Sequence, residues 1–230
     1  MNQSIRGSDY VFNFAALADL DKSINKPLET AKINIIGTIN SLILSKKNRI
    51  KKYIQASSIY ANSEQGGFYG ASKKAAEDYI ERFSKKFKLN YSILRFGSLY
   101  GPNAGPSNGI NKIIQKYKKK KILMYKGKKN SARRYIHVDD ACKVCQKSLS
   151  GKYNNKYLIV TGRKKIKITE VMKYLSRIYN YKKKIYYQNL EIEGHYTKEP
   201  KKFIPRPGEN LFIKKYKKLD IELKKLAGGR

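Results

Sequence analysis

The chain has 230 residues, a formal net charge of +34 and two cysteines. This length provides one substantial hydrophobic core, being long for a single domain and short for two. Because no run of about eighteen apolar residues and no apolar leader occurs, we expect neither a membrane span nor a secretory signal, and we predict a cytoplasmic protein.

The positive charge, 51 Lys and Arg against 17 Asp and Glu, has two explanations. A nucleic-acid-binding protein gathers cations that displace counterions from phosphates. Alternatively, a Lys-rich composition overlies an ordinary enzyme. The cations form short runs along the whole chain, such as residues 46–47, 118–121 and 182–184, rather than one basic tail. We therefore favour the second explanation and do not expect nucleic-acid binding.

The first half of the chain alternates between strand-like and helix-like segments. Residues 10–16 are expected to form a buried strand that ends in small residues. A helix is expected over 27–44, where apolar residues recur at helical spacing and a proline occupies the first turn. The strand 53–57, the helix 69–87 and the strand 90–96 follow. This order predicts an α/β fold with a parallel sheet covered on both faces, and ligands at the carboxyl ends of its strands.

The second half has shorter and more mixed elements. A loop over 101–109 precedes a Lys-rich amphipathic helix that begins at Ile110. The tail after Gly194 is expected to be irregular until about Leu219. The remaining expected elements are short strands at 122–125, 135–138 and 157–160, and helices at 139–149 and 169–179.

Tyr69 and Lys73 stand four residues apart in the expected helix 69–87, so their side chains would share one face, a turn apart. A nearby ammonium favours the phenolate, and Tyr69 would then exchange protons closer to neutral pH. Ser57 and Ser58, at the end of the preceding strand, would hold a substrate hydroxyl against the phenol. Such pairs also occur on solvated helix faces, and this chain has 19 Tyr, so the surrounding sequence must decide.

Six sequence blocks in a fixed order provide that context. The chain resembles the NAD-dependent epimerase/dehydratase family, extended short-chain dehydrogenases that act on nucleotide sugars. The resemblance covers about Asp9 to Thr169 and implies a Rossmann-type sheet. The blocks are Phe14-Ala15-Ala16, Asn34-Ile35-Ile36-Gly37-Thr38, Ala56-Ser57-Ser58-Ile59-Tyr60, Tyr69-Gly70-Ala71-Ser72-Lys73, Arg95-Phe96-Gly97-Ser98-Leu99-Tyr100-Gly101-Pro102 and Arg133-Arg134-Tyr135-Ile136-His137-Val138-Asp139-Asp140.

The resemblance implies a role for each block. Tyr69 would carry the proton and Lys73 would hold the ribose of NAD. Ala56 occupies the place of the family's catalytic Ser or Thr, so Ser57 or Ser58 must substitute. Ser98 and Arg133 would contact the phosphates of a nucleotide sugar, a UDP-sugar above all, because a planar guanidinium suits a diphosphate. The residues expected to bind the cofactor are Phe14, Ala15, Ala16, Asn34, Ala56, Tyr69, Lys73 and Phe96.

The family's glycine-rich turn, which receives the cofactor pyrophosphate at a helix N-terminus, has no counterpart in this sequence. We expect the chain to be truncated at its N-terminus and to bind NAD weakly by itself. Residues 1–100 would be the C-terminal part of a nucleotide-binding Rossmann domain, and residues 101–230 mainly a small substrate-binding domain. We also expect a homodimer.

The resulting prediction is a nucleotide-sugar 4-epimerase that works through a 4-keto intermediate, inactive if the truncation removes the cofactor site. The family's dehydratases carry an Asp-Glu pair where Ser57 and Ser58 stand, which disfavours elimination. The alternatives are a reductase or dehydratase of the same family, or a non-catalytic Lys-rich remnant that binds polyanions. Cys142 and Cys145 imitate half a metal site, yet no second pair completes it, so we predict no metal and two core-facing cysteines. We expect His195 to be structural or exposed.

Overall fold

The computed structural model describes residues 5–190 and 207–228, so His195 and the tail up to residue 206 lie outside the described residues. The chain forms two compact units. Within the described residues, the first unit comprises 5–96, 144–160 and 207–211, and the second comprises 97–143, 161–190 and 212–228. In this described part, no helix is long and apolar enough to cross a membrane.

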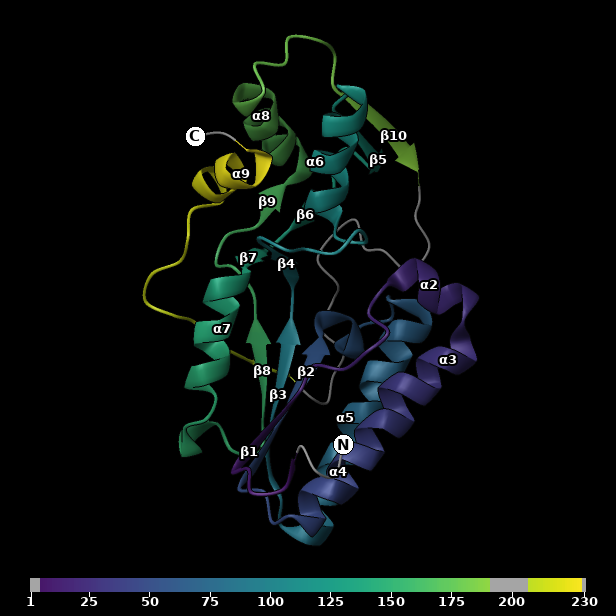
Figure 1. Cartoon of the computed structure of the whole chain (residues 1–230), viewed down its shortest axis with the longest axis vertical. Helices are drawn as coiled ribbons and strands as arrows, with labels where there is room; N and C mark the ends of the chain where they lie inside the picture. The colour runs from purple at the N-terminus through teal and green to yellow at the C-terminus, as the bar shows by residue number, and fades with distance from the viewer. Residues whose placement is uncertain (1–4, 191–206, 229–230) are drawn as a thin grey trace. The chain divides into compact units, whose positions relative to one another are not determined.

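A five-stranded sheet forms the centre of the first unit (Figure 1). The strand order is β1-β2-β3-β8-β11 and every neighbouring pair is parallel. The predicted α/β class with a parallel sheet is therefore confirmed. The strands are β1 (Tyr10–Asn13), β2 (Lys52–Ser58), β3 (Asn90–Phe96), β8 (Lys156–Val160) and β11 (Glu209–Asn210).

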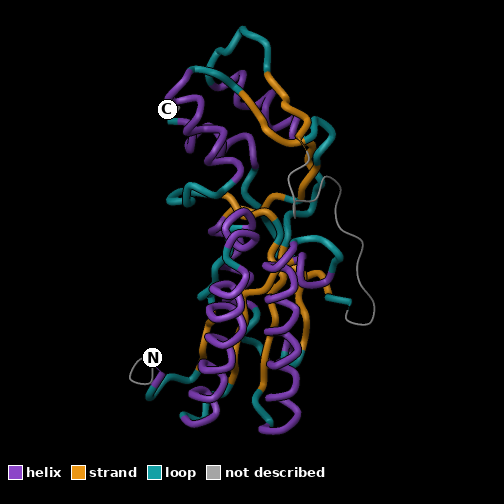
Figure 2. The backbone as a smooth tube through the Cα atoms, turned by 90° about the vertical axis from the view of Figure 1, so that its right-hand side faces the viewer, coloured by secondary structure: helices purple, strands orange, loops and turns teal. Residues whose placement is uncertain are grey.

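Long helices run beside the strands of this unit, as the turned view in Figure 2 shows. The helix expected over 27–44 is present and extends to Lys47, but its middle is π-helical, which the sequence pattern did not indicate. Leu42, Tyr53, Ile80 and Ile93 form part of one buried cluster, so α4 and α5 pack on the sheet through apolar side chains. The helical elements are α2 (Leu20–Asn25), α3 (Pro27–Ala31), the π-helix η1 (Lys32–Ile36), α4 (Gly37–Lys47), the 3-10 helix η2 (Ile59–Asn62), α5 (Gly67–Phe87) and η3 (Gly151–Tyr153).

Strand β1 is shorter than expected, and the prediction that it is buried is wrong except at Asn13, because β1 lies at the edge of the sheet and leaves Tyr10 and Phe12 exposed. The side-chain oxygen of Asn13 accepts a hydrogen bond from the backbone N–H of Ala15 at 3.2 Å. Such a local bond between an Asn side chain and the backbone competes with the pairing of a strand, and the pairing of β1 with β2 ends at Asn13. The chain therefore leaves the sheet at Asn13, and Phe14, Ala15 and Ala16 follow as a loop.

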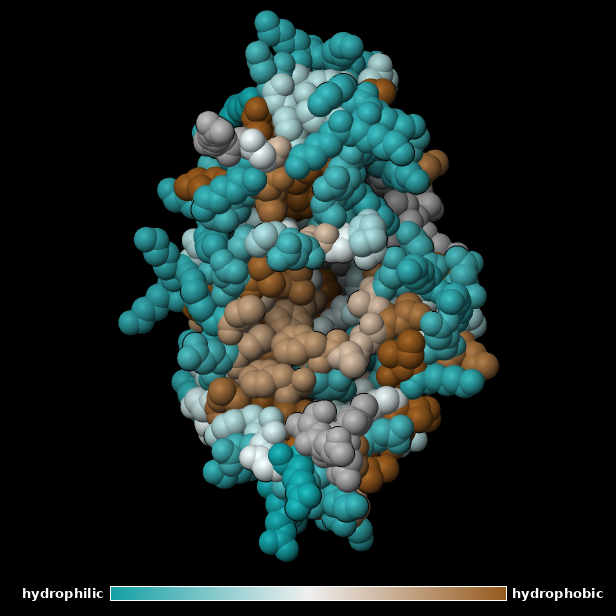
Figure 3. All heavy atoms as spheres, viewed as in Figure 1, coloured by the Kyte–Doolittle hydropathy of each residue, from teal (hydrophilic) through white to brown (hydrophobic). Residues whose placement is uncertain are grey.

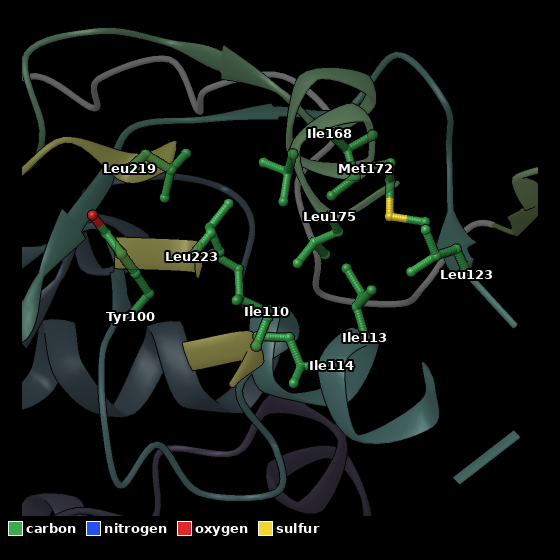
Figure 4. Packing of buried hydrophobic residues seen from close by; sticks show 12 residues of the cluster. Tyr100, Ile110, Ile113, Ile114, Leu123, Ile168, Met172, Leu175, Leu219 and Leu223 are labelled. Atoms are coloured by element: carbon green, nitrogen blue, oxygen red, sulfur yellow. The ribbon is translucent and has the colours of Figure 1, made fainter. Parts of the chain in front are cut away.

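The second unit is built from short strand pairs and helices around its own core. Figure 4 shows this core, to which Ile113 comes from α6, Met172 and Leu175 from α8, and Leu223 from α9. The pairs are β4 with β7, β6 with β9, and β5 with β10. The elements are β4 (Ser98–Tyr100), α6 (Gly109–Lys120), β5 (Met124–Gly127), β6 (Ala132–Arg133), β7 (Tyr135–His137), β9 (Ile166–Lys167), α8 (Ile168–Ile178), β10 (Tyr186–Leu190) and α9 (Leu219–Ala227); α7 (Val138–Lys147) divides between the units.

The expected helices of the second half are confirmed as α6, α7 and α8. The strand expected at 122–125 begins later, at Met124, because α6 ends in the left-handed residue Lys121 (φ 53°) and the chain must turn before it can extend. Strands β4, β6, β9 and β10 and the strand β11 in the tail were not predicted. Each of them pairs with a segment distant in the sequence, which a local pattern does not show.

Candidate functional site

The carboxyl ends of β1, β2 and β3 bring predicted cofactor residues together at one edge of the sheet. Ser58 and Phe96 end their strands and face each other in register. The rings of Phe14 and Phe96 lie 6.3 Å apart. Over β2, β3 and β8, Figure 3 shows apolar atoms gathered on the viewed face. The carboxyl edge of a parallel sheet is where ligands bind in such folds.

Helix α5 begins beside this edge under tight backbone constraints. Gly66 precedes it with φ 97°, a conformation that favours glycine. A Cβ on Gly70 would lie 2.7 Å from the backbone oxygen of Gln65, so a side chain there would displace the loop. These two glycines hold the first turn of α5, and with it Tyr69, close to the loop that follows β2.

Tyr69 and Lys73 are both buried, on one face of α5 as predicted. Burial raises the pKa of Tyr69 to about 12, while a hydrogen bond with the Ser58 side chain acts in the opposite direction. Burial also lowers the pKa of Lys73 to about 8, opposed by Glu77. The expectation that Lys73 brings the pKa of Tyr69 towards neutrality is wrong for this arrangement, because burial dominates.

The ammonium of Lys73 is directed at the end of strand β2. Its Nζ donates a hydrogen bond to the carbonyl oxygen of Ala56 at 2.9 Å and lies 5.8 Å from the centre of the Tyr69 ring. Lys73 therefore supplies a buried donor next to the phenol rather than a direct ion pair with it.

The two serines at the end of β2 have different partners. Ser57 Oγ donates to Glu77 Oε1 at 2.6 Å. Ser58 Oγ accepts from the backbone N–H of Tyr60 at 3.2 Å and is hydrogen-bonded to Tyr69. Of the two serines that the sequence left open, Ser58 is the one that is hydrogen-bonded to Tyr69.

Asn34 is buried inside the π-helical stretch and makes three hydrogen bonds. Its Oδ1 accepts from the backbone N–H of Leu17 at 2.7 Å, and its Nδ2 donates to the carbonyl oxygen of Leu17 at 3.1 Å and to Ser72 Oγ at 2.9 Å. Asn34 thus ties the loop after β1, which holds Ala15 and Ala16, to α5 directly beside Lys73. A π-helical turn at such a position is common near functional sites.

Ser98 and Arg133 belong to the second unit. Ser98 begins β4 and lies opposite Tyr135, whereas Arg133 ends β6 and lies opposite Ile166. Both side chains are half-buried. Their predicted contact with substrate phosphates stays a prediction.

Two buried residues near the site had no predicted role. Glu77 and Arg95 form an ion pair with 1% and 2% of their side chains exposed. Glu77 follows Lys73 by four residues in α5. This spacing is the one sequence feature that could have indicated that the two side chains lie next to each other.

Among the described residues, no group of three or more His, Cys, Asp or Glu side chains is placed to hold a metal ion. The expectation that both cysteines face the core is wrong, because Cys142 is exposed and Cys145 half-buried. Ala141 and Val144 take the buried positions of α7 instead.

Residues 1–159 match the family model described as NAD dependent epimerase/dehydratase family. The chain belongs to this family. It is 28% identical over 192 residues to the UDP-glucuronate 4-epimerase of Thermodesulfobacterium geofontis, a match that covers 78% of this chain and 59% of that protein.

Two solved structures have the same fold. The UDP-glucose 4-epimerase of Thermotoga maritima, solved with UDP-glucose, matches with a TM-score of 0.81 and 23% identity over 96% of this chain and 76% of that chain. The UDP-N-acetylglucosamine 4-epimerase of Methanobrevibacter ruminantium, solved with UDP-N-acetylmuramic acid, matches with a TM-score of 0.82 and 23% identity. This match covers 99% of this chain and 78% of that chain. The chain spans 56%, 59% and 36% of the lengths of three curated relatives.

Proposed function

We propose that the chain is a nucleotide-sugar 4-epimerase that uses NAD and a UDP-sugar. The observation that carries the proposal is the buried group of Tyr69, Ser58 and Lys73 at the carboxyl edge of the parallel sheet. Family membership and the names of the relatives support the same reaction class. We also propose that the first unit holds the cofactor and the second the sugar nucleotide, in a cytoplasmic protein.

The residues present fit the nicotinamide end of NAD. Tyr69 and Lys73 supply a hydroxyl and an ammonium for a ribose, and Phe14 and Phe96 supply an apolar wall. Among the described residues, no G-x-G-x-x-G turn joins a strand to a helix, so the residues fit the nicotinamide end of NAD and supply no site of this kind for the pyrophosphate. When bound, NAD would supply the acceptor and donor of hydride.

The proposed roles follow from the contacts. Ser58 would orient the sugar 4-hydroxyl. Tyr69 would take the proton of that hydroxyl and return it after the 4-keto sugar has rotated to present its other face. A phenol with a pKa raised to about 12 is protonated at neutral pH, so it needs a neighbouring positive charge when it ionises. Lys73 provides that charge and, with a pKa near 8, can itself exchange a proton close to neutrality.

The serines favour an epimerase over a dehydratase. Elimination of water needs an acid and a base beside the proton carrier. The two positions that would supply them hold serines, whose hydroxyls are neither acid nor base at neutral pH, and Ser57 donates to Glu77 while Ser58 is hydrogen-bonded to Tyr69. A reductase that uses the same Tyr69 chemistry is the second candidate.

Replacing Tyr69 by Phe tests the assignment, with Tyr79→Phe on the exposed face of the same helix as the control. Because the hydroxyl is the proton carrier, turnover of UDP-sugars should fall at least ~100-fold in Tyr69→Phe, while UDP-sugar affinity changes little. The assay uses the chain itself and a chimera in which a family member's glycine-rich N-terminal segment precedes it. Turnover of Tyr69→Phe within about threefold of the parent would exclude Tyr69 as the proton carrier.

We further propose a homodimer. Large apolar side chains remain exposed along η1, α4 and α5, among them Ile33, Ile36, Ile43, Tyr79 and Phe87. A row of this kind on two neighbouring helices is typical of an interface. Light scattering on the purified chain should give twice the monomer mass; a monomer mass at micromolar concentration would contradict the proposal.

A further inference from the structure

Three ionisable residues occupy successive turns of one face of α5. Tyr69, Lys73 and Glu77 are spaced by four residues each, and all three are buried. Lys73 is 3% exposed and Glu77 is 1% exposed. Two opposite charges one turn apart in a dry environment interact more strongly than the same pair on a helix surface.

The carboxylate of Glu77 is held from two strands. Arg95 on β3 donates through Nε to Oε1 at 2.9 Å and through Nη2 to Oε2 at 2.6 Å. Ser57 on β2 donates to Oε1 at 2.6 Å. Arg95 also stacks on Tyr157, with its Cζ 4.4 Å from the ring centre. This bidentate geometry fixes the carboxylate in one position.

Such a pair contributes little net stability by itself, because the desolvation of two charges offsets their attraction. The cluster contains a third buried charge, however. Lys73 and Arg95 are both cationic and share one buried anion, Glu77. Without that carboxylate, Lys73 and Arg95 would be two buried cations in a group that contains no anion.

We propose that Glu77, fixed by Arg95 and Ser57, is a positioning residue that keeps Lys73 protonated and directed at the Ala56 carbonyl beside Tyr69. The inference rests on the proposed function, in which Lys73 supplies the charge that Tyr69 needs. The ionisable and charged groups around Lys73 are Tyr69 and Glu77 on α5 and, behind Glu77, Arg95 on β3; β2 contributes the neutral Ala56 carbonyl. Glu77 is thus the one anion in this set.

The direct test measures the titration of the Lys73 side chain by NMR in the full chain labelled with ¹³C at lysine Cε, with Lys73→Arg to assign the resonance. Glu77→Gln keeps the shape and removes the charge, so the Lys73 midpoint should fall by about one pH unit or more, a tenfold change in its proton affinity. Glu81→Gln, which removes the same charge one turn further along α5, should shift it by no more than about 0.3 units. An unchanged midpoint in folded Glu77→Gln, or an equal shift in both variants, would overturn the inference.

The double variant Glu77→Gln/Arg95→Gln keeps the proposal testable if Glu77→Gln fails to fold, because it leaves no unpaired charge at Arg95. It removes the anion next to Lys73 together with the cation behind it, so the Lys73 midpoint should still fall, by a smaller amount than in Glu77→Gln; no movement, or an upward shift, would count against Glu77 as the controlling group. The titration needs neither substrate nor cofactor. A shifted midpoint in a chain that does not turn over UDP-sugars would therefore reject the proposed function alone, and an unshifted midpoint in an active chain would reject this inference alone.

Discussion

Both units bury ionisable side chains, but they assemble them in different ways. In the first unit, Tyr69, Lys73 and Glu77 come from one helix, and Arg95 completes the group from the adjoining strand β3. In the second unit, Asp140 on α7 accepts a hydrogen bond from the backbone N–H of Lys217, 77 residues further along the chain. The cluster of the first unit depends mainly on the spacing of residues within α5. The cluster of the second unit forms only when segments that are far apart in the sequence pack together.

The clusters also differ in their access to water. Arg95 and Glu77 are 2% and 1% exposed, whereas the Lys217–Asp139 pair is 32% and 51% exposed. Salt screens exposed charges and leaves buried pairs nearly unaffected. The first cluster should therefore govern stability and chemistry at any ionic strength, and the second should weaken as salt rises.

Removing Arg95 should have the largest effect. Arg95→Ala leaves Glu77 without its bidentate partner and removes the stacking on Tyr157, so the free energy of unfolding should drop by about 3–5 kcal/mol. Lys217→Ala should cost far less, because its partner Asp139 is half exposed and solvated. Denaturant unfolding of both variants at low and high salt measures the difference. Similar losses for the two would show that the clusters are energetically equivalent.

Arg133 tests whether the second unit contributes a specific ligand contact. Charge-assisted hydrogen bonds to a diphosphate contribute roughly 1.5–3 kcal/mol each, so Arg133→Ala should weaken UDP-sugar binding at least ~10-fold. Retention on heparin should hardly change, because it depends on the total number of cations. Lys126→Ala, an exposed cation on β5, is the matched control. Equal small losses for both ligands would mean that Arg133 is one more surface charge.

The pH dependence of stability should differ between the units. Burial lowers the pKa of Lys52, which donates to the carbonyl oxygens of Ser148 and Ser150, to about 8, as it does for Lys73. Below pH 8 both lysines are charged in the folded and in the unfolded chain, so the burial of two charged ammonium groups destabilises the folded chain in full. Between about 8 and 10.5 the folded chain binds fewer protons, so the free energy of unfolding should rise with pH. Lys52→Met should reduce that rise in chemical denaturation.

His137 in the second unit should affect the stability of the fold at acid pH. Burial, followed by the nearby Lys217, lowers its pKa from 6.5, and its Nδ1 accepts a hydrogen bond from the backbone N–H of Asp139. The unfolded chain therefore binds the proton first, and stability should fall as the pH drops from 6.5 through the lower folded pKa. His137→Asn should flatten this acid limb of the melting temperature and leave the alkaline limb unchanged. An unaltered acid limb would assign it to other groups.

The sequence predicted the elements that depend on local pattern. The strand over 90–96 and the helix starting near Tyr69 were found because apolar periodicity is visible within one segment. The pairing of β8 with β3 and of β11 with β8 was not foreseen, since it joins segments far apart in the chain.

The site shows the same division. The prediction that Tyr69 and Lys73 share one face of a helix is confirmed. The predicted direction of the Tyr69 pKa shift is wrong, because a sequence does not show how deeply a phenol is buried. The choice between Ser57 and Ser58 likewise needed the position of Glu77, which captures Ser57.

The central claim is that the Tyr69 edge of the first unit interconverts UDP-sugars at C4 without net oxidation. Supplying the chain, and the chimera with a glycine-rich N-terminal segment, with NAD and a UDP-hexose deuterated at C4 tests this directly by NMR of the products. We expect the C4 epimer to appear with deuterium retained at C4, and Tyr69→Phe to abolish the conversion. Loss of water from the sugar, release of a keto or reduced product, or no conversion by the chimera would contradict the account.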